Sequence, residues 1–485
     1  MGIPNQYPKT GLAAAALIGV WMPFLAIGIQ TTSLNNPQRV LEDAMNASFT
    51  AHYGQILSEA DQTMLWAFTT TLYSLGIVLT SLVCAFLPSA LSMRDLGLGL
   101  AAALLVTGLA MIVATYYAQA FELFIIGQFV FGIGAGICLT LAPIFINEIS
   151  HPDWRGLLNS LSHLGTWMGS AIAAVISVDS LLGGATRWPF LFMVPLVIAL
   201  LQLLTYSCIP QSPAFYLIKG DFQKADEAHR FFHGLESLPD IHDLPVVSQS
   251  GWSRIAEMWR PKYRSVFLIG ILATISQNVS GIYAVKLYST EFIMSLGLDL
   301  DMAQTGTVAI SLLSVLFSLP AGVLVEWIGR RRLMISTIAI MAACHLAFFA
   351  LTFANERFPD NNLVLALFVP IIVIFLLAFN VGPGTISNFI SSEILPRRLS
   401  RTMAALGVCS NHIVSSAVSL LFYPLQKAIG AYVFLFFAVP LLLLFFTFLS
   451  LLPETRGQRK ATVFLDPEGT PLLSRPFSTP ALDHF

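Results

Sequence analysis

Long apolar stretches recur along the whole chain, and they restrict its fold more than any other feature. Each stretch is about 20 residues long, the length that an α-helix needs to cross a hydrocarbon core of roughly 30 Å. Charged residues fall in short clusters between the stretches. The pattern predicts an all-α polytopic membrane protein with twelve transmembrane helices, at residues 11–32, 63–88, 96–117, 121–146, 158–178, 188–209, 265–288, 303–325, 333–354, 363–390, 402–423 and 430–452.

The composition excludes a soluble globular enzyme. Of the 485 residues, 56% are hydrophobic and only 11% are charged, whereas an ordinary soluble domain carries about 25% charged residues. No small-residue cleavage site follows the first stretch, so we expect it to be a retained span and not a signal peptide. The five cysteines have no spacing that suggests a metal site or a disulfide framework, and we expect no cofactor.

The distribution of basic residues places both termini in the cytoplasm. An even number of spans puts the two termini on the same side, and Lys and Arg are enriched in cytoplasmic loops. With the termini inside, only five of the 25 Lys and Arg residues lie outside: Arg39, Arg187, Lys286, Arg357 and Lys427.

The chain divides into two halves. We expect an N-terminal six-helix bundle at residues 1–209 and a C-terminal six-helix bundle at residues 265–453. The spacing of apolar residues within 210–264 predicts a helical cytoplasmic insert. The tail, residues 454–485, is rich in Pro, Ser and Thr and is expected to be disordered. Six spans, an insert and six spans is the layout of a transporter built from two parallel repeats.

One external loop carries a candidate glycosylation site. Asn46-Ala47-Ser48 lies in the loop at residues 33–62, on the side where glycosylation occurs. The same pattern at Asn278-Val279-Ser280 lies within a span, so we do not expect it to be modified.

Short motifs repeat at matching places in the two halves, each with a carboxylate followed by arginine. The loops after spans four and ten read "NEISHPDWRG" (147–156) and "SSEILPRRLSR" (391–401). Further motifs are "VEWIGRRR" (325–332), "LPETRG" (452–457), "NNPQ" (35–38), "IPQSPAFYLI" (209–218), "SQNVSGIYAV" (276–285) and "FNVGPGTISNF" (379–389). Through these motifs the chain resembles the sugar porter family of the major facilitator superfamily, and more narrowly the animal facilitative glucose transporters. The resemblance implies a major facilitator fold of two six-helix bundles.

Polar side chains in the middle of span seven indicate a substrate pathway. A polar side chain at the bilayer midplane is costly unless it faces a cavity or a partner, and Gln and Asn both donate and accept hydrogen bonds, as neutral sugars require. The resemblance implies that this span carries the main sugar-contacting amides. Carried over position by position, it gives the substrate-binding set His163, Gln277, Asn278, Tyr283, Ser314, Asn380, Asn388, Asn411 and His412.

Most of this set departs from the family pattern. Asn380 stands where glucose carriers have a glutamate, and Asn388 and His412 stand where they have tryptophans. We therefore do not expect glucose to be the best substrate. An alternative interpretation is that His163 is a packing histidine bonded to a facing helix, and that Asn388 and His412 fill the space of the lost tryptophans.

The cytoplasmic charges are expected to latch the two halves together. The resemblance implies salt bridges that form when the cytoplasmic face is closed and thereby bias two states a few kcal/mol apart. The candidate gate residues are Glu148, Arg155, Glu326, Arg330, Arg331 and Glu393. The alternative is a set of solvated loop charges, each of which contributes little. Gln128 and Gln211 replace charged residues of the family in the first half, so we expect a weakened latch there.

The sequence predicts passive transport. Proton-driven relatives place an aspartate in the first span where this chain has Gln30, and the interiors of spans one, five and seven carry no Asp or Glu. The expected function is facilitative uniport of a hexose or related polyol across the plasma membrane, with membrane lipid as the other partner. No basic stripe suggests nucleic acid, no nucleophile and base suggest an enzyme, and the oligomeric state stays open. The alternatives are a carrier for another small polar solute and a non-transporting sugar sensor.

Overall fold

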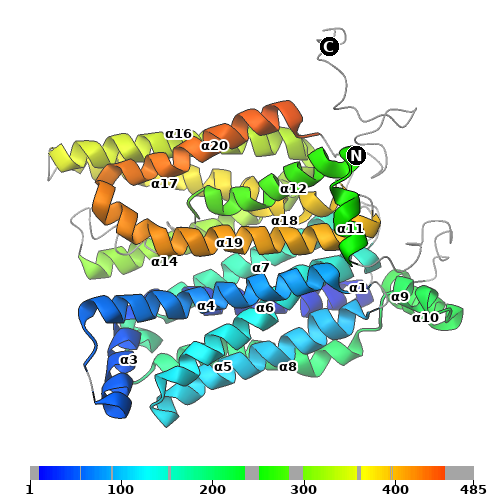
Figure 1. Ribbon diagram of the computed structural model, residues 1–485, viewed down its shortest axis with the longest axis horizontal. Helices are drawn as coiled ribbons and strands as arrows, with labels where there is room; N and C mark the ends of the chain where they lie inside the picture. Colours follow the sequence, from blue (N-terminus) through cyan, green and yellow to red (C-terminus); the bar gives the residue numbers. More distant parts are fainter. Residues whose placement is uncertain are drawn as a thin grey trace, which may run out of the picture.

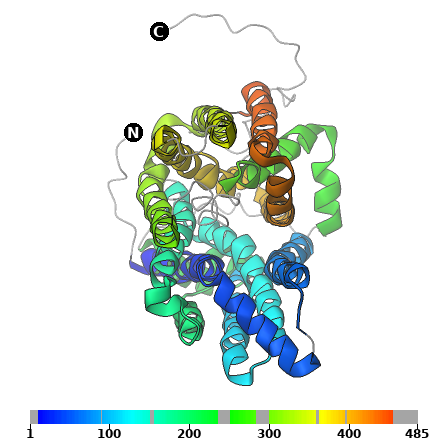
Figure 2. The same ribbon diagram turned by 90° about the vertical axis from the view of Figure 1, so that its left-hand side faces the viewer.

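A computed structural model describes residues 10–54, 56–88, 91–150, 155–234, 251–282, 299–357, 362–393, 395 and 397–453. Every regular element within these ranges is a helix. In this described part, nine helices are long and apolar enough to cross a membrane by length and composition. Figure 1 shows the long helices lying side by side, and Figure 2 shows them nearly end-on, in two groups.

The first group is the N-terminal half, drawn in blue and cyan in Figure 2. Its first span is α1, a π-helical turn η1, and α2. The elements of the six spans are α1 (Thr10–Ala16), η1 (Leu17–Trp21), α2 (Met22–Thr32), α4 (Glu59–Phe86), η2 (Asp95–Leu100), α5 (Ala101–Ala118), α6 (Phe121–Ile149), α7 (Arg155–Ile176) and α8 (Trp188–Thr205).

The second group is the C-terminal half, drawn in green, yellow and orange. Its elements are α12 (Pro261–Val279), α14 (Leu300–Ser318), α15 (Ala321–Ile328), α16 (Arg330–Arg357), α17 (Asn362–Val381), α18 (Pro383–Glu393), α19 (Arg397–Ile429) and α20 (Val433–Leu451). Together the two groups supply helices at all twelve predicted spans.

Each half has its own apolar core. Phe131 and Phe145 are fully buried in the core of the N-terminal half, and Phe375 and Phe448 are fully buried in that of the C-terminal half. The halves meet mainly where α4 packs against α19 and α7 packs against α14. Because each half is stabilised by its own core, the halves can shift against each other without unfolding.

Glycines bring the backbones of α2 and α7 together in the N-terminal half. A Cβ atom at Gly28 would overlap the carbonyl oxygen of Thr166, and one at Gly169 would overlap that of Leu25. Small residues allow such close approach between helices in lipid, where van der Waals contact drives association. These two glycines therefore fix the position of α7.

Short helices lie at opposite ends of the bundle (Figure 1). The expected cytoplasmic insert contributes α9 (Pro213–Ile218), α10 (Phe222–His233) and α11 (Gly251–Met258) at one end. Ser212 and Asp221 cap α9 and α10 by accepting from the backbone N–H groups of Phe215 and Lys224. The start of the first span packs against α10, which places Thr10 at the end where the insert lies.

The segment expected to be an external loop contains a helix, α3 (Gln38–Tyr53), at the opposite end of the bundle. Asn46 of the sequon lies within α3, and Ser48 is buried, with its hydroxyl accepting from the N–H of Phe121 at 2.9 Å. Glycosylation at Asn46 remains a prediction, now for a helical site and not for an open loop.

Three spans are interrupted where their sequences carry Gly or Pro. Helix α12 ends at Val279, earlier than the expected end of that span, and Gly281 follows with φ of +78°. The eighth span changes from α14 to α15 at Pro320, whose ring nitrogen has no hydrogen to donate. The tenth span changes from α17 to α18 at Gly382. The expected part of span seven beyond 282 lies outside the described residues.

We expect Gly169→Ala to destabilise the protein, because the new methyl group would overlap the Leu25 carbonyl oxygen. Overpacking of this kind costs about 1–3 kcal/mol, and thermal unfolding in detergent should show a lower Tm. The control is Gly184→Ala, where the added Cβ meets only the Asp179 carbonyl oxygen at 3.4 Å. Equal melting temperatures for the two variants would show that the close approach of α2 and α7 is not critical.

Candidate functional site

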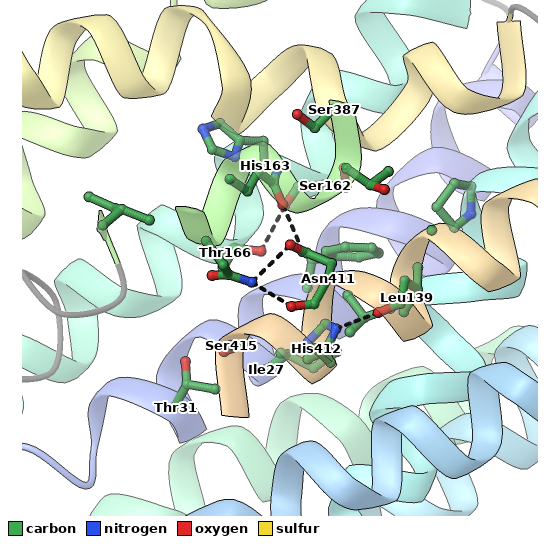
Figure 3. A pocket seen from close by; sticks show the side chains of 18 of the residues that line it. Ile27, Thr31, Leu139, Ser162, His163, Thr166, Ser387, Asn411, His412 and Ser415 are labelled. Atoms are coloured by element: carbon green, nitrogen blue, oxygen red, sulfur yellow. Dashed lines mark hydrogen bonds between the residues drawn. The ribbon is translucent and has the colours of Figure 1, made fainter. Parts of the chain in front are cut away.

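A cavity of about 240 Å³ lies between the two halves (Figure 3). Ligand pockets generally occupy roughly 300–1,000 Å³, so this cavity suits a small solute. Its polar lining from the N-terminal half is Thr31, Asn35, Thr140, Ser162, His163 and Thr166. Its polar lining from the C-terminal half is Thr274, Gln277, Asn278, Ser387, Asn411, His412 and Ser415. Among the described residues that line it, none is Asp, Glu, Lys or Arg.

Three amides on the C-terminal side form a hydrogen-bonded cluster. Asn411 Nδ2 donates to Gln277 Oε1 at 2.9 Å, and Asn278 Nδ2 donates to both the Oδ1 and the backbone oxygen of Asn411 at 2.8 Å. Gln277 Nε2 donates to the backbone oxygen of Gly384 at 2.9 Å. The cluster therefore ties α12 to α18 and α19 and holds the amides in a fixed arrangement.

A hydrogen bond joins the two halves beside the cavity. His163 Nε2 on α7 lies 3.2 Å from Asn380 Oδ1 on α17, and both side chains are buried. Asn380 uses its amide nitrogen to donate to the Leu376 carbonyl at 2.8 Å. Its Oδ1 is thus the acceptor, and His163 Nε2 carries the proton. The predicted substrate residue Asn380 contacts His163 and does not itself line the cavity.

Aromatic rings form an apolar side of the cavity. The rings of His163, Trp167 and Phe379 lie with each pair of centroids 6.3 Å apart. Trp167 and Phe379 both line the cavity. Their faces supply the apolar surface that ligand pockets combine with a few polar groups.

His412 supplies an acceptor at the cavity. Its Nδ1 lies 3.0 Å from the Val408 carbonyl oxygen, one helical turn back on α19. A carbonyl oxygen only accepts, so Nδ1 carries the proton and Nε2 of the neutral ring is an acceptor. Figure 3 shows His412 and Asn411 on the same helix, beside Ile27 and Leu139 of the other half.

The remaining predicted residues are placed differently. Ser314 is fully buried on α14, donates to the Ile310 carbonyl at 2.9 Å, and does not line the cavity. Tyr283 lies outside the described residues, as does the side chain of Asn388 on α18.

Sequence reasoning missed most of the small polar residues of the lining. Thr166, for example, donates to the carbonyl of Ser162 in its own helix at 3.0 Å, as Ser and Thr commonly do in any membrane helix. A hydroxyl alone is therefore a weak signal. Asn35 had a stronger one, since it opens the "NNPQ" motif.

Comparison with known proteins gives the family of this chain. The sequence model described as "Sugar (and other) transporter" matches residues 15–462. The chain belongs to the sugar transporter family.

Curated relatives cover nearly the full chain. The chain is 30% identical over 474 residues to the mouse "Solute carrier family 2, facilitated glucose transporter member 4", covering 94% of this chain and 91% of the relative. The human protein of the same description is 29% identical over the same shares.

A solved structure gives the fold. The proton:xylose symporter XylE bound to 6-bromo-6-deoxy-D-glucose superposes with a TM-score of 0.74 at 20% identity, covering 93% of this chain and 98% of that one. The fold is the major facilitator fold, with twelve transmembrane helices in two six-helix bundles, and the predicted fold class is confirmed.

In this member of the sugar transporter family, an ion pair joins the halves at the end where the insert lies. Arg401 Nη2 on α19 lies 3.4 Å from Glu148 Oε1 on α6. The other carboxylate oxygen of Glu148 accepts from Ser212 Oγ at 2.7 Å. Arg401 was not among the predicted gate residues, because it is displaced by one position from the arginine of the family pattern.

The carboxyl end of α4 is held by side chains from beyond its own half. Arg254 Nη2 of α11 donates to the Leu87 carbonyl at 2.8 Å and to that of Ala85 at 3.3 Å. Thr402 Oγ1 also donates to Ala85, and Arg401 Nη1 donates to Pro88, both at 3.3 Å. Cations stabilise the carboxyl end of a helix, where carbonyl groups lack intrahelical partners. We call Arg254, Arg401 and Thr402 the α4 collar.

Of the predicted gate residues, Glu148 takes part in the ion pair between the halves. The structure also describes the side chains of Arg330 and Arg331. Arg330 is buried, and Arg331 donates to the Leu449 carbonyl at 2.7 Å within its own half. Residues 155, 326 and 393 lie in α7, α15 and α18, and their side chains are outside the described part.

The turn after span two keeps a polar network despite its lost charges. Gln211 Nε2 donates to Asp95 Oδ2 at 2.8 Å, and Gln211 Oε1 accepts from Ser92 at 2.7 Å. Arg94 donates to the Ile209 carbonyl at 2.8 Å. The neutral amide of Gln211 therefore bonds to two residues of the turn and joins the turn to the segment after span six.

We expect Arg401→Met to open the end where the insert lies more often, because it removes the ion pair and one bond of the α4 collar. With both side chains of the pair partly exposed, a loss of about 1 kcal/mol, or roughly a fivefold shift in the two-state equilibrium, is expected. The measurement is the labelling rate of a cysteine at Ala404, which lines the cavity, by an impermeant thiol reagent from the side where the insert lies, with exposed Cys208 removed.

The matched control is Arg331→Met. Arg331 also donates to a helix-end carbonyl, but within one half, so its removal should leave the labelling rate near that of the unchanged protein. The same acceleration in both variants would contradict a latch between the halves.

Proposed function

We propose that this protein carries out facilitative uniport of a hexose or a related polyol by alternating access. The observation that supports this best is the neutral, amide-rich cavity between two separately packed halves. Sugar hydroxyls need partners that both donate and accept, and the three amides of the cluster provide both. The curated relatives named as facilitated glucose transporters support the same class of substrate.

The absence of an ionisable acid in the pathway helices supports passive transport. Within α2, α7 and α12 of the described part there is no Asp or Glu. Gln30 of α2 stands where the proton-driven relatives carry an aspartate, and it is buried. A neutral amide binds no proton at physiological pH, so it supplies no coupling between sugar movement and a proton gradient.

The two halves supply the moving parts. The Arg401–Glu148 pair and the α4 collar join the halves at one end of the protein, and their separation would open the cavity to that side. Transporters of this class move one bundle against the other around a fixed central site. We place the collar and both termini in the cytoplasm, with the protein in the plasma membrane. The Lys and Arg distribution supports this orientation.

The departures in the cavity lining and beside it support a substrate other than glucose. His163 and Asn380 replace a glutamine and a glutamate of the glucose carriers, and they bond to each other across the halves. His412 replaces a tryptophan and offers an acceptor where the tryptophan offers only an N–H donor. The pattern favours a polyol or hexose with a donor hydroxyl facing His412.

The proposed function predicts saturable uptake of glucose, fructose or a polyol into liposomes that contain the purified protein, with equal rates with and without a pH gradient. Gln277→Ala should raise the KM about tenfold or more, because losing hydrogen bonds of this kind costs about 1–3 kcal/mol. The control is Gln202→Ala. Gln202 is also a buried amide, but it donates to the Leu98 carbonyl at 3.4 Å away from the cavity.

Several results would change the assignment. Uptake that follows the pH gradient would overturn uniport, and binding without uptake would favour the sensor. Uptake of a different polar solute alone would favour another carrier class.

A second prediction concerns substrate choice. We expect His163→Gln to change the ratio of kcat/KM between two sugars by about tenfold, since losing or gaining one well-placed hydrogen bond alters discrimination by that order. Competition uptake with two labelled sugars measures the ratio directly. An unchanged ratio would favour the interpretation of His163 as a packing histidine.

A further inference from the structure

The break in span seven comes directly after the two amides of that helix that line the cavity. Gln277 and Asn278 are in the last turn of α12, which ends at Val279. The last carbonyl groups of a helix lack intrahelical N–H partners and need others when they are buried. In a membrane helix such a carbonyl has no water to bond to, so the partner of Ser280 is informative.

That partner is His345 of α16, in span nine. Its Nε2 lies 2.7 Å from the Ser280 carbonyl oxygen, and the side chain is 1% exposed. A carbonyl oxygen only accepts, so Nε2 carries the proton. In the neutral ring Nδ1 then carries a lone pair and no hydrogen. It has no hydrogen-bond partner within the described part of the chain. Among the described residues, the imidazole therefore has one hydrogen bond, the bond to the Ser280 carbonyl.

Phenylalanine rings hold the imidazole in place. The rings of Phe375, Phe437, Phe348 and Phe434 have centroids 5.3, 5.4, 6.0 and 6.2 Å from that of His345. They come from α16, α17 and α20, so three helices fix one ring orientation. An enclosed apolar setting of this kind strengthens the bond to Ser280, because no competing polar group is near.

Gly281 lies against the same ring. Its φ of +78° is in the left-handed region that favours glycine. A Cβ atom there would lie 3.0 Å from Cε1 and 3.1 Å from Nε2 of His345. The histidine thus lies against the turn itself and leaves little room for a side chain at position 281.

The break is connected to the backbone of the two cavity amides. Ser280 Oγ donates to the carbonyl of Gln277, and the N–H of Gly281 donates to the carbonyl of Asn278 at 3.1 Å. The next residue, Ile282, donates its N–H to Ser280 Oγ at 3.3 Å and lines the cavity. A shift of the Ser280 carbonyl would therefore move the amides that face the substrate.

We propose that His345 is a positioning residue for the substrate site: its bond to Ser280 holds the break in span seven so that Gln277 and Asn278 face the cavity. This proposal rests on the proposed function, since the cavity amides are taken to bind the transported sugar. His345 itself does not line the cavity. A residue that acts in this way alters substrate affinity without touching the substrate.

The first experiment compares three variants in liposome uptake. His345→Leu removes the donor and keeps a side chain of similar bulk, and it should raise the KM about tenfold with kcat changed less than about twofold. His345→Gln restores an N–H at the reach of Nε2, and its KM should stay within about threefold of the unchanged protein. Phe348→Leu removes a ring from the same enclosure without affecting the bond, so its KM should not change.

The pattern among the variants separates positioning from packing. If Phe348→Leu and His345→Leu raise the KM equally, or if His345→Gln fails to rescue, His345 is a packing residue and the proposal is wrong. Thermal unfolding of each purified variant shows whether a loss of uptake is a loss of folded protein.

The second experiment does not depend on sugar transport. Hydrogen exchange followed by mass spectrometry should show faster exchange around Gly281 and Ile282 in His345→Leu, and near-normal exchange in His345→Gln. Unchanged exchange in His345→Leu would overturn the proposal even if the KM rises. If the unchanged protein transports none of the sugars, the proposed function fails, while the exchange result still decides whether His345 holds the break.

Discussion

The cost of an unpaired polar group in lipid is the constraint on which the rest of this structure depends. A side-chain amide or a free carbonyl without a partner costs several kcal/mol where water is absent. Beside the cavity, the chain meets this constraint by pairing polar groups with each other. Gln277, Asn278 and Asn411 form one closed cluster, and His163 bonds to Asn380. The polar site and the contacts that join helices are therefore the same set of bonds.

The same constraint acts at the carboxyl end of α4. Its last carbonyl groups are satisfied by Arg254 from the insert and by Arg401 and Thr402 from the C-terminal half. Moving the halves apart at this end exposes those carbonyls, and water can then replace the lost partners. In the closed arrangement the partners must be protein groups. Separation of the halves at this end would thus leave the carbonyls satisfied in both arrangements, which is the condition for a two-state switch.

The sequence predicts those features whose cause is local. Twelve apolar runs follow from the length of the bilayer crossing, and Gln277 and Asn278 stand out because amides are rare inside such runs. His345 gave no such signal, because a single histidine in an apolar span indicates packing as readily as function. Arg254 looked like one of many charges of the insert, and its contact with the carbonyls of Ala85 and Leu87 joins residues more than 160 positions apart. Such pairs depend on the packing of distant helices, which residue spacing does not encode.

The amides that face the cavity also bond to one another. Because an unpaired amide is costly away from water, the bonds among Gln277, Asn278 and Asn411 stabilise the arrangement of the site. A sugar that binds must exchange these bonds for its own, and such an exchange yields only a small net free energy. Such an exchange favours modest affinity and rapid release, and the bond from His345 to Ser280 lies beside the amides that take part in it.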